Sequence, residues 1–177
     1  QIQSEKIKRY KMTTDPRGFV LIINNINFSN KDIRNGAPQD SFKMKNLFIS
    51  LGFQVDVKKD LSAQDIFTTL KDLSTFERLH QVDSLIVVLM SHGNNEVIIG
   101  TDCERLCVMD LIKLFDADHC PAMMTKPKMF IVNACRGDDE DYGPIKFGAT
   151  RPSYDRLELD SGPNSFRRQP ANSDFLI

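Results

Sequence analysis

Four short apolar runs, separated by helix-like segments, dominate the pattern of this chain. The runs are rich in β-branched and aromatic side chains, which is typical of buried strands. They cover Phe19–Ile23, Phe53–Val57, Leu85–Met90 and Met129–Val132. The helix-like segments cover Ser41–Leu51, Ser62–Phe76 and Val108–Phe115, with Ser62 as an expected N-cap. This alternation predicts a three-layer α/β/α fold, in which helices cover both faces of a mainly parallel sheet.

Composition excludes several classes of protein. Lys and Arg number 23 against 24 Asp and Glu, a formal net charge of −1, whereas nucleic-acid-binding domains usually carry a basic excess. No apolar run reaches the roughly 20 residues of a membrane span, and no secretory signal is recognisable. The four cysteines all follow residue 100, which favours reduced thiols over a disulfide framework. We therefore expect a cytoplasmic globular protein without nucleic-acid or membrane partners.

The pattern divides the chain into four parts. Residues 1–17 are a polar lead-in, and residues 18–137 contain all the predicted strands and helices. Residues 138–170 are expected to be an exposed linker, because four of the nine glycines and four of the eight prolines lie between Gly137 and Pro170. Residues 171–177 turn apolar again and predict the start of a further strand. The fold is expected to need residues beyond this point.

Polar residues with catalytic potential follow two of the predicted strands. In open α/β sheets, chemistry occurs at the carboxyl ends of the strands. His92 follows one run and Cys135 follows another, so we expect them at the same edge. A thiol becomes a strong nucleophile as a thiolate, which a neighbouring imidazole favours. The backbone N–H groups of Gly93 and Cys135 are candidate donors to an oxyanion. These residues predict a cysteine hydrolase.

Several motifs together resemble the caspase family. The segment Asn133-Ala134-Cys135-Arg136-Gly137 differs by one residue from the caspase pentapeptide Q-A-C-[RQG]-G. Ser91-His92-Gly93 is similar to the family's histidine motif, and Arg34-Asn35-Gly36 to its arginine loop. The resemblance extends from Arg17 to Gly137, and Asp174-Phe175-Leu176 is similar to the start of the small subunit. The chain resembles a caspase large subunit followed by the intersubunit linker.

The resemblance implies a role for each matching residue in catalysis. Cys135 attacks the peptide carbonyl and His92 protonates the leaving amine. The backbone N–H groups of Gly93 and Cys135 form the oxyanion hole. The implied activity is an endopeptidase that cleaves after aspartate.

The resemblance also implies a substrate pocket. Arg34 binds the substrate aspartate, because a guanidinium grips a carboxylate through two hydrogen bonds. Ser91 and Asn133 are further candidate substrate-binding residues. Asn133 stands where the family has glutamine and is one methylene shorter, so we expect a shift of Arg34, a bridging water or a looser aspartate pocket.

Partners and processing follow from the same resemblance. The large subunit requires the caspase small subunit, from the same polypeptide or a cleaved chain, and two such units form a homodimer. Asp160-Ser161 in the linker is similar to a processing site, which implies activation by cleavage. Asp141, Asp155 and Asp174 are the other candidate positions. Protein substrates, together with adaptor or inhibitor proteins, are the other expected partners, in apoptosis or inflammatory signalling. No cofactor and no metal are expected.

Two other interpretations are open at this point. A pseudo-caspase would keep the fold without strong activity and regulate an active relative, and Asn133 favours this reading. A flavodoxin-like binding module would show flavin absorbance. A zinc site at Cys103, Cys107, His119 and Cys120 is disfavoured, because their spacing lacks the paired short gaps of such sites.

Overall fold

The four predicted strands all form, and they lie next to one another in a seven-stranded sheet. The computed structural model describes residues 10–94, 96–136 and 175–176. The strands are β1 (Gly18–Asn24), β2 (Gln54–Lys59), β3 (Ser84–Gly93), β4 (Val97–Ile99), β5 (Arg105–Cys107), β6 (Lys128–Arg136) and β7 (Phe175–Leu176). The α-helices are α1 (Ala37–Ser50), α2 (Ala63–Ser74) and α3 (Val108–Lys113), and short 3-10 helices cover Glu77–Gln81 and Pro121–Met123.

The sheet is mainly parallel, as predicted. Strands β2, β1, β3, β6 and β7 pair in that order, and each of these pairs is parallel. Strand β4 joins the end of β3 in the antiparallel sense, and β5 pairs antiparallel with β4. The β4–β5 hairpin therefore extends the sheet at the carboxyl end of β3.

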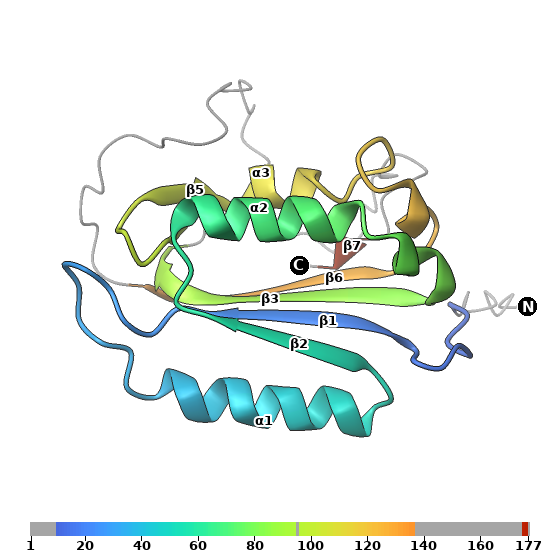
Figure 1. Ribbon diagram of the computed structural model, residues 1–177, viewed down its shortest axis with the longest axis horizontal. Coiled ribbons are helices and arrows are strands. Elements are labelled where there is room, and N and C mark those ends of the chain that lie inside the picture. The colour runs from blue at the N-terminus through green and yellow to red at the C-terminus, as the bar shows by residue number, and fades with distance from the viewer. Residues whose placement is uncertain (1–9, 95, 137–174, 177) are drawn as a thin grey trace, which may run out of the picture.

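Helices cover both faces of this sheet, which confirms the α/β prediction (Figure 1). Phe19, Leu21 and Ile23 of β1 pack in a core cluster with residues of α2 and α3. Val20 and Ile22 of the same strand belong to a second cluster, with Phe48 of α1. Alternate residues of β1 thus supply the two cores, as the period of two in a strand requires.

Helix boundaries differ from the sequence prediction by a few residues. Helix α1 begins at Ala37, four residues before the predicted Ser41. Pro38 interrupts the sequence pattern there, but proline is tolerated in the first turn, where its missing N–H has no intrahelical partner. Ser62 caps α2 as predicted, because its hydroxyl accepts a hydrogen bond from the backbone N–H of Asp65. None of the helices in the described part of the chain is long and apolar enough to cross a membrane.

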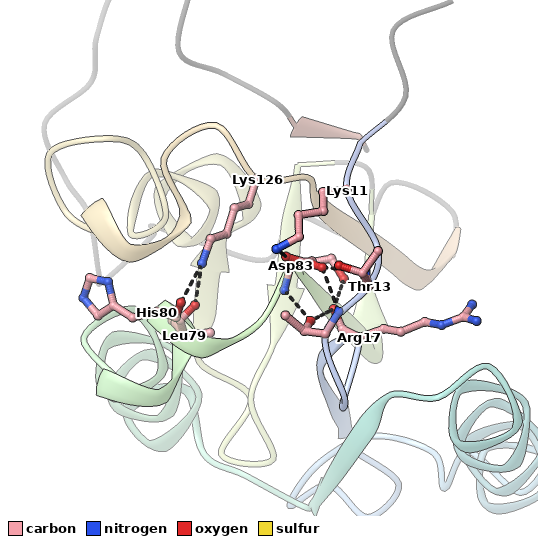
Figure 2. Close-up of polar contacts among 9 residues, drawn as sticks. Lys11, Thr13, Arg17, Leu79, His80, Asp83 and Lys126 are labelled. Carbon is pink, nitrogen blue, oxygen red and sulfur yellow. Dashed lines mark hydrogen bonds and ion pairs between the residues drawn. The ribbon is translucent and has the colours of Figure 1, made fainter.

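Asp83 binds residues near the end of the polar lead-in, at the amino-terminal side of the sheet (Figure 2). Its Oδ2 accepts hydrogen bonds from the backbone N–H groups of Thr13 at 2.7 Å and Thr14 at 3.0 Å. The Lys11 ammonium lies 3.8 Å from Oδ1. These contacts, with the Thr14 backbone bond foremost, lower the pKa of Asp83 even though burial opposes its ionisation. The lead-in next to β1 is therefore held by a carboxylate directly before β3.

Candidate active site

His92 and Cys135 are paired on neighbouring parallel strands. The register of β3 and β6 sets Met90 opposite Asn133 and His92 opposite Cys135. The apolar runs predict strands that end before these residues, and that prediction was wrong: β3 continues to Gly93 and β6 to Arg136. The backbone ladder continues after the apolar run ends, because pairing needs only backbone N–H and C=O groups. The two predicted catalytic residues thus occupy adjacent backbone positions.

The half-buried His92 imidazole is held by the loop between β1 and α1. Its Nε2 lies 2.8 Å from the backbone carbonyl oxygen of Asp32. A carbonyl only accepts hydrogen bonds, so Nε2 carries the hydrogen and Nδ1 is the basic nitrogen of the neutral ring. The Phe28 ring packs against the imidazole with a centroid separation of 4.6 Å. The contacts fix both the tautomer and the orientation of His92.

Sequence reasoning missed both of these supporting contacts. The Asp32 contact is made by a backbone carbonyl, which leaves no mark in the side-chain pattern. Phe28 was visible as an aromatic residue within a polar loop. A large ring in such a loop needs a packing partner, and this was the one signal that could have identified it.

Gly93 occupies a backbone conformation that favours glycine. Its φ is +148°, in the region that residues with a β-carbon rarely adopt. A β-carbon here would collide with the Val97 carbonyl oxygen and come within 3.0 Å of the Ile98 Cα. The residue after His92 is therefore glycine for a local geometric reason, whatever its backbone N–H does in catalysis.

The Arg34 guanidinium is anchored at the carboxyl end of β1. Its Nη1 donates to the Asn25 carbonyl oxygen at 2.8 Å and to Asn24 Oδ1 at 3.3 Å. Its Nε is buried and has no hydrogen-bond partner among the described residues. Buried polar atoms are nearly always paired, so this Nε is an exception within the described part of the chain.

Arg34 contacts Asn24, which lies at the same register level of the sheet as Asn133. Asn24, Met90 and Asn133 are register partners across β1, β3 and β6. His92 lies two residues after Met90, so the two side chains share a face of the sheet. Asn133 is exposed, and its side chain makes no hydrogen bond to another described residue. The structure thus brings Arg34, Asn133 and His92 to one edge of the sheet.

Ser91 does not join this group. Its side chain lies on the opposite face from His92, because successive strand residues alternate. The residue is 2% exposed, and its hydroxyl donates to the Ile99 carbonyl oxygen of β4. The hydroxyl of Ser91 is used within the protein, to hold β4 against β3.

The remaining expectations concern cysteines, metals and processing. Cys103, Cys107 and Cys120 are free thiols, and burial is the largest effect on Cys120, raising its pKa. Across residues 10–94, 96–136 and 175–176, no three His, Cys, Asp or Glu residues are grouped to hold a metal ion. The predicted processing site, Asp160-Ser161, lies outside the described residues.

Comparison with known proteins identifies the family. A sequence model of the caspase domain matches residues 17–177. Caspase-2 of Gallus gallus is 37% identical over 174 residues, which cover 94% of this chain and 41% of that protein. Caspase-3 of Mesocricetus auratus is 34% identical over 173 residues, which cover 94% of this chain and 57% of that protein. The chain belongs to the caspase family.

The match covers only part of each relative. The chain spans 41% of the caspase-2 relative and 54% of the caspase-7 relative from Gallus gallus, to which it is 36% identical. The family match therefore covers nearly all of this chain, whereas the relatives contain further sequence.

Proposed function

We propose that this chain carries the nucleophile and the general acid–base of a cysteine endopeptidase that cleaves proteins after aspartate. The observation that supports this most strongly is the pairing of His92 with Cys135 on adjacent strands, with Arg34 anchored at the same edge. Covalent catalysis needs a nucleophile next to a base, and the register of β3 and β6 pairs these two residues at the backbone. Family membership supports the same chemistry.

The proposed mechanism uses the tautomer that the Asp32 carbonyl selects. The Cys135 thiol gives its proton to His92 Nδ1, and the resulting thiolate forms a bond to the substrate carbonyl carbon. The N–H groups of Gly93 and Cys135 donate hydrogen bonds to the oxyanion. As the carbon–nitrogen bond breaks, the imidazolium returns its proton to the leaving amine. Water, deprotonated by His92, then hydrolyses the acyl-thioester and releases the acid and the thiol.

Arg34 supplies the proposed selectivity for aspartate. Asn24 and Asn25 hold the guanidinium in place through Nη1, and a guanidinium grips a carboxylate through paired N–H groups. Asn133 is the proposed second contact, through its amide. Ser91 is a weaker candidate for substrate binding, because its hydroxyl already donates to Ile99.

The complete enzyme requires more than this chain. Because the relatives extend beyond the matched region, we propose that a small subunit completes the substrate groove and that two large–small units form a dimer. Cleavage between Asp160 and Ser161 is the proposed activation step. Roles in apoptosis or inflammatory signalling, in the cytoplasm and under control of adaptors or inhibitors, follow from the family.

A pseudo-caspase is the second candidate, and one observation favours it. Asn133 stands where the family pentapeptide has glutamine, and its amide is carried on a side chain one methylene shorter. A pocket weakened in this way would favour a regulatory role through pairing with an active relative.

The test is peptide hydrolysis by the complete polypeptide, including its small subunit. Fluorogenic peptides ending in Asp or Glu measure kcat/KM for the native protein, Cys135→Ala and Arg34→Lys. We expect no turnover by Cys135→Ala and a loss of about 10- to 100-fold on Asp peptides by Arg34→Lys, the equivalent of one charged hydrogen bond. Arg78→Lys is the matched control, because this arginine contacts Gln54 and the Phe19 ring instead. Equal turnover by native protein and Cys135→Ala would contradict the proposal.

A further inference from the structure

One loop supplies the groups that hold both His92 and the substrate-binding arginine. The loop follows β1 and covers residues 25–36 (Figure 1). It contributes Phe28 and the Asp32 carbonyl to His92, and it carries Arg34. Whatever fixes the path of this loop therefore affects both catalysis and recognition.

Asp60 binds the first residues of this loop through three hydrogen bonds. It directly follows β2, at the same edge of the sheet. Its Oδ1 accepts from the backbone N–H groups of Ile26 at 2.7 Å and Asn27 at 2.9 Å. Its Oδ2 accepts from Asn27 Nδ2 at 2.8 Å. Both carboxylate oxygens are thus used on two consecutive loop residues.

The contact is reciprocal, because Asn25 binds the residue after Asp60. Asn25 Oδ1 accepts from the Leu61 backbone N–H at 2.9 Å, and its Nδ2 donates to the Leu61 carbonyl oxygen at 3.0 Å. Each segment therefore fixes the backbone of the other. These reciprocal hydrogen bonds of residues 25–27 with Asp60 and Leu61 join the ends of β1 and β2, and we call this set of contacts the clasp.

Ile26 and Asn27 connect this clasp to the site. The Ile26 N–H donates to Asp60, and the Ile26 carbonyl oxygen accepts from the Arg34 backbone N–H at 3.1 Å. Phe28, which packs on His92, comes immediately after Asn27. The Asp60 carboxylate thus fixes the loop backbone at two residues. Ile26 binds the backbone of Arg34, and Asn27 precedes Phe28, which packs on His92.

The conformation and charge of Asp60 suit this position. Its φ is +52°, a region that aspartate tolerates better than most residues. Partial burial is the largest single effect on its pKa and acts to raise it, but the hydrogen bonds from Asn27 and Ile26 and the nearby Lys59 outweigh burial and lower the pKa. The acceptor is therefore an ionised carboxylate at neutral pH.

We propose that Asp60 is a positioning residue, which orients His92 and Arg34 by clasping the loop at Ile26 and Asn27. This inference rests on the proposed peptidase function, for which it names a determinant outside the reacting groups. The Asp60 carboxylate bonds to Ile26 and Asn27 of the loop, and its proposed effect on the site is transmitted through them.

The test compares Asp60→Asn with Asp56→Asn in the complete polypeptide. An asparagine offers one acceptor oxygen, so at least one of the three donors on the loop loses its partner. Asp56 is an exposed carboxylate on β2, the strand that ends directly before Asp60, and it is paired only with Lys58 among the described residues. It therefore controls for the loss of a negative charge. If Asp60→Asn fails to fold, Asn27→Ala replaces it in the test. Asn27→Ala removes only the hydrogen bond from the Asn27 side chain to Asp60 and keeps the two backbone hydrogen bonds.

Two measurements separate positioning from a general loss of stability. Alkylation of Cys135 by iodoacetamide, followed by peptide mapping across pH, reports the thiolate without any turnover. Loosening the Asp32 contact leaves the imidazole less well oriented to take the Cys135 proton, so the thiolate forms less readily. The alkylation midpoint of Asp60→Asn is expected to rise by at least about 0.5 pH unit. The Asp-over-Glu ratio of kcat/KM is expected to fall at least about threefold, and this ratio does not depend on the fraction of folded enzyme.

Each outcome decides the inference. Asp56→Asn should match the native protein in both measurements, and Asn27→Ala should shift them in the same direction as Asp60→Asn but less. If Asp60→Asn keeps the native midpoint and ratio, whether or not its melting temperature falls, Asp60 is not a positioning residue. Absence of turnover by the native protein would contradict the proposed function alone, since the alkylation midpoint still tests the clasp.

Discussion

Replacing Gly93 with alanine tests the geometry directly after His92. Gly93 has a φ of +148° and pairs with Ile98 of β4. An added β-carbon would meet the Val97 carbonyl oxygen and, at 3.0 Å each, the Val97 carbonyl carbon and the Ile98 Cα. All three atoms belong to backbone, so no side-chain rotation can relieve the collision.

The expected cost comes from two sources. A residue other than glycine in this backbone region costs about 1–3 kcal/mol. Forcing an extra carbon into a packed site costs about 1–3 kcal/mol more. The sum, roughly 2–6 kcal/mol, is a large share of the 5–15 kcal/mol that typically stabilises a domain. Each kcal/mol lowers the Tm by about 2–4 °C in a protein of this size.

Gly36→Ala is the matched control. Gly36 caps α1 with a φ of −79° and has no atom within 4 Å of an added β-carbon. The added methyl group meets no other atom, although alanine is a poorer N-cap than glycine, so we expect stability within about 1 kcal/mol of native.

Thermal unfolding followed by circular dichroism measures both variants in the complete polypeptide. Gly93→Ala should melt well below native protein and Gly36→Ala should not. If the two variants had the same Tm, the positive φ and the close approach of β4 at Gly93 would be refuted.

Three further predictions concern other described residues. Asp83→Asn should lower the free energy of unfolding at neutral pH. Because the pKa of Asp83 is lowered in the folded protein, the stabilisation by its carboxylate is lost as the pH falls below about 4. Chemical denaturation should therefore give the two proteins the same free energy of unfolding at low pH, and a difference that stays constant with pH would contradict this. Asn133→Gln should raise the Asp-over-Glu ratio of kcat/KM, by up to about 10- to 100-fold if a full charged hydrogen bond is restored; an unchanged ratio would count against an Asn133 contact with substrate. Phe28→Leu should lower kcat by about two- to tenfold with little effect on KM, because an aromatic pair contributes about 0.5–1.5 kcal/mol; a selective rise in KM would argue against packing on His92.

The strands and the catalytic pair could be predicted from the sequence for a physical reason. Buried parallel strands read as short apolar runs, and the carboxyl ends of such strands meet at one edge. His92 and Cys135 each followed such a run, so their proximity was predictable before their register was known. The ends of β3 and β6 were not, because backbone pairing continues through polar residues.

The supporting contacts around the site could not be predicted in this way. The Asp32 carbonyl that binds His92 is a backbone atom 60 positions from it. The clasp of Asp60 on Asn27 joins residues 33 positions apart, and both are exposed polar residues. Such residues carry no hydrophobic pattern, and only the fold brings them together.

Intact mass spectrometry of the complete polypeptide tests the central proposal most directly. Native protein and Cys135→Ala are expressed, concentrated and weighed side by side. The account predicts a cut after Asp160 in the native protein that is absent from Cys135→Ala, which would identify the nucleophile, the acidic specificity and the processing site together. No cut in either protein at concentrations that favour dimers would contradict the peptidase proposal and favour the pseudo-caspase.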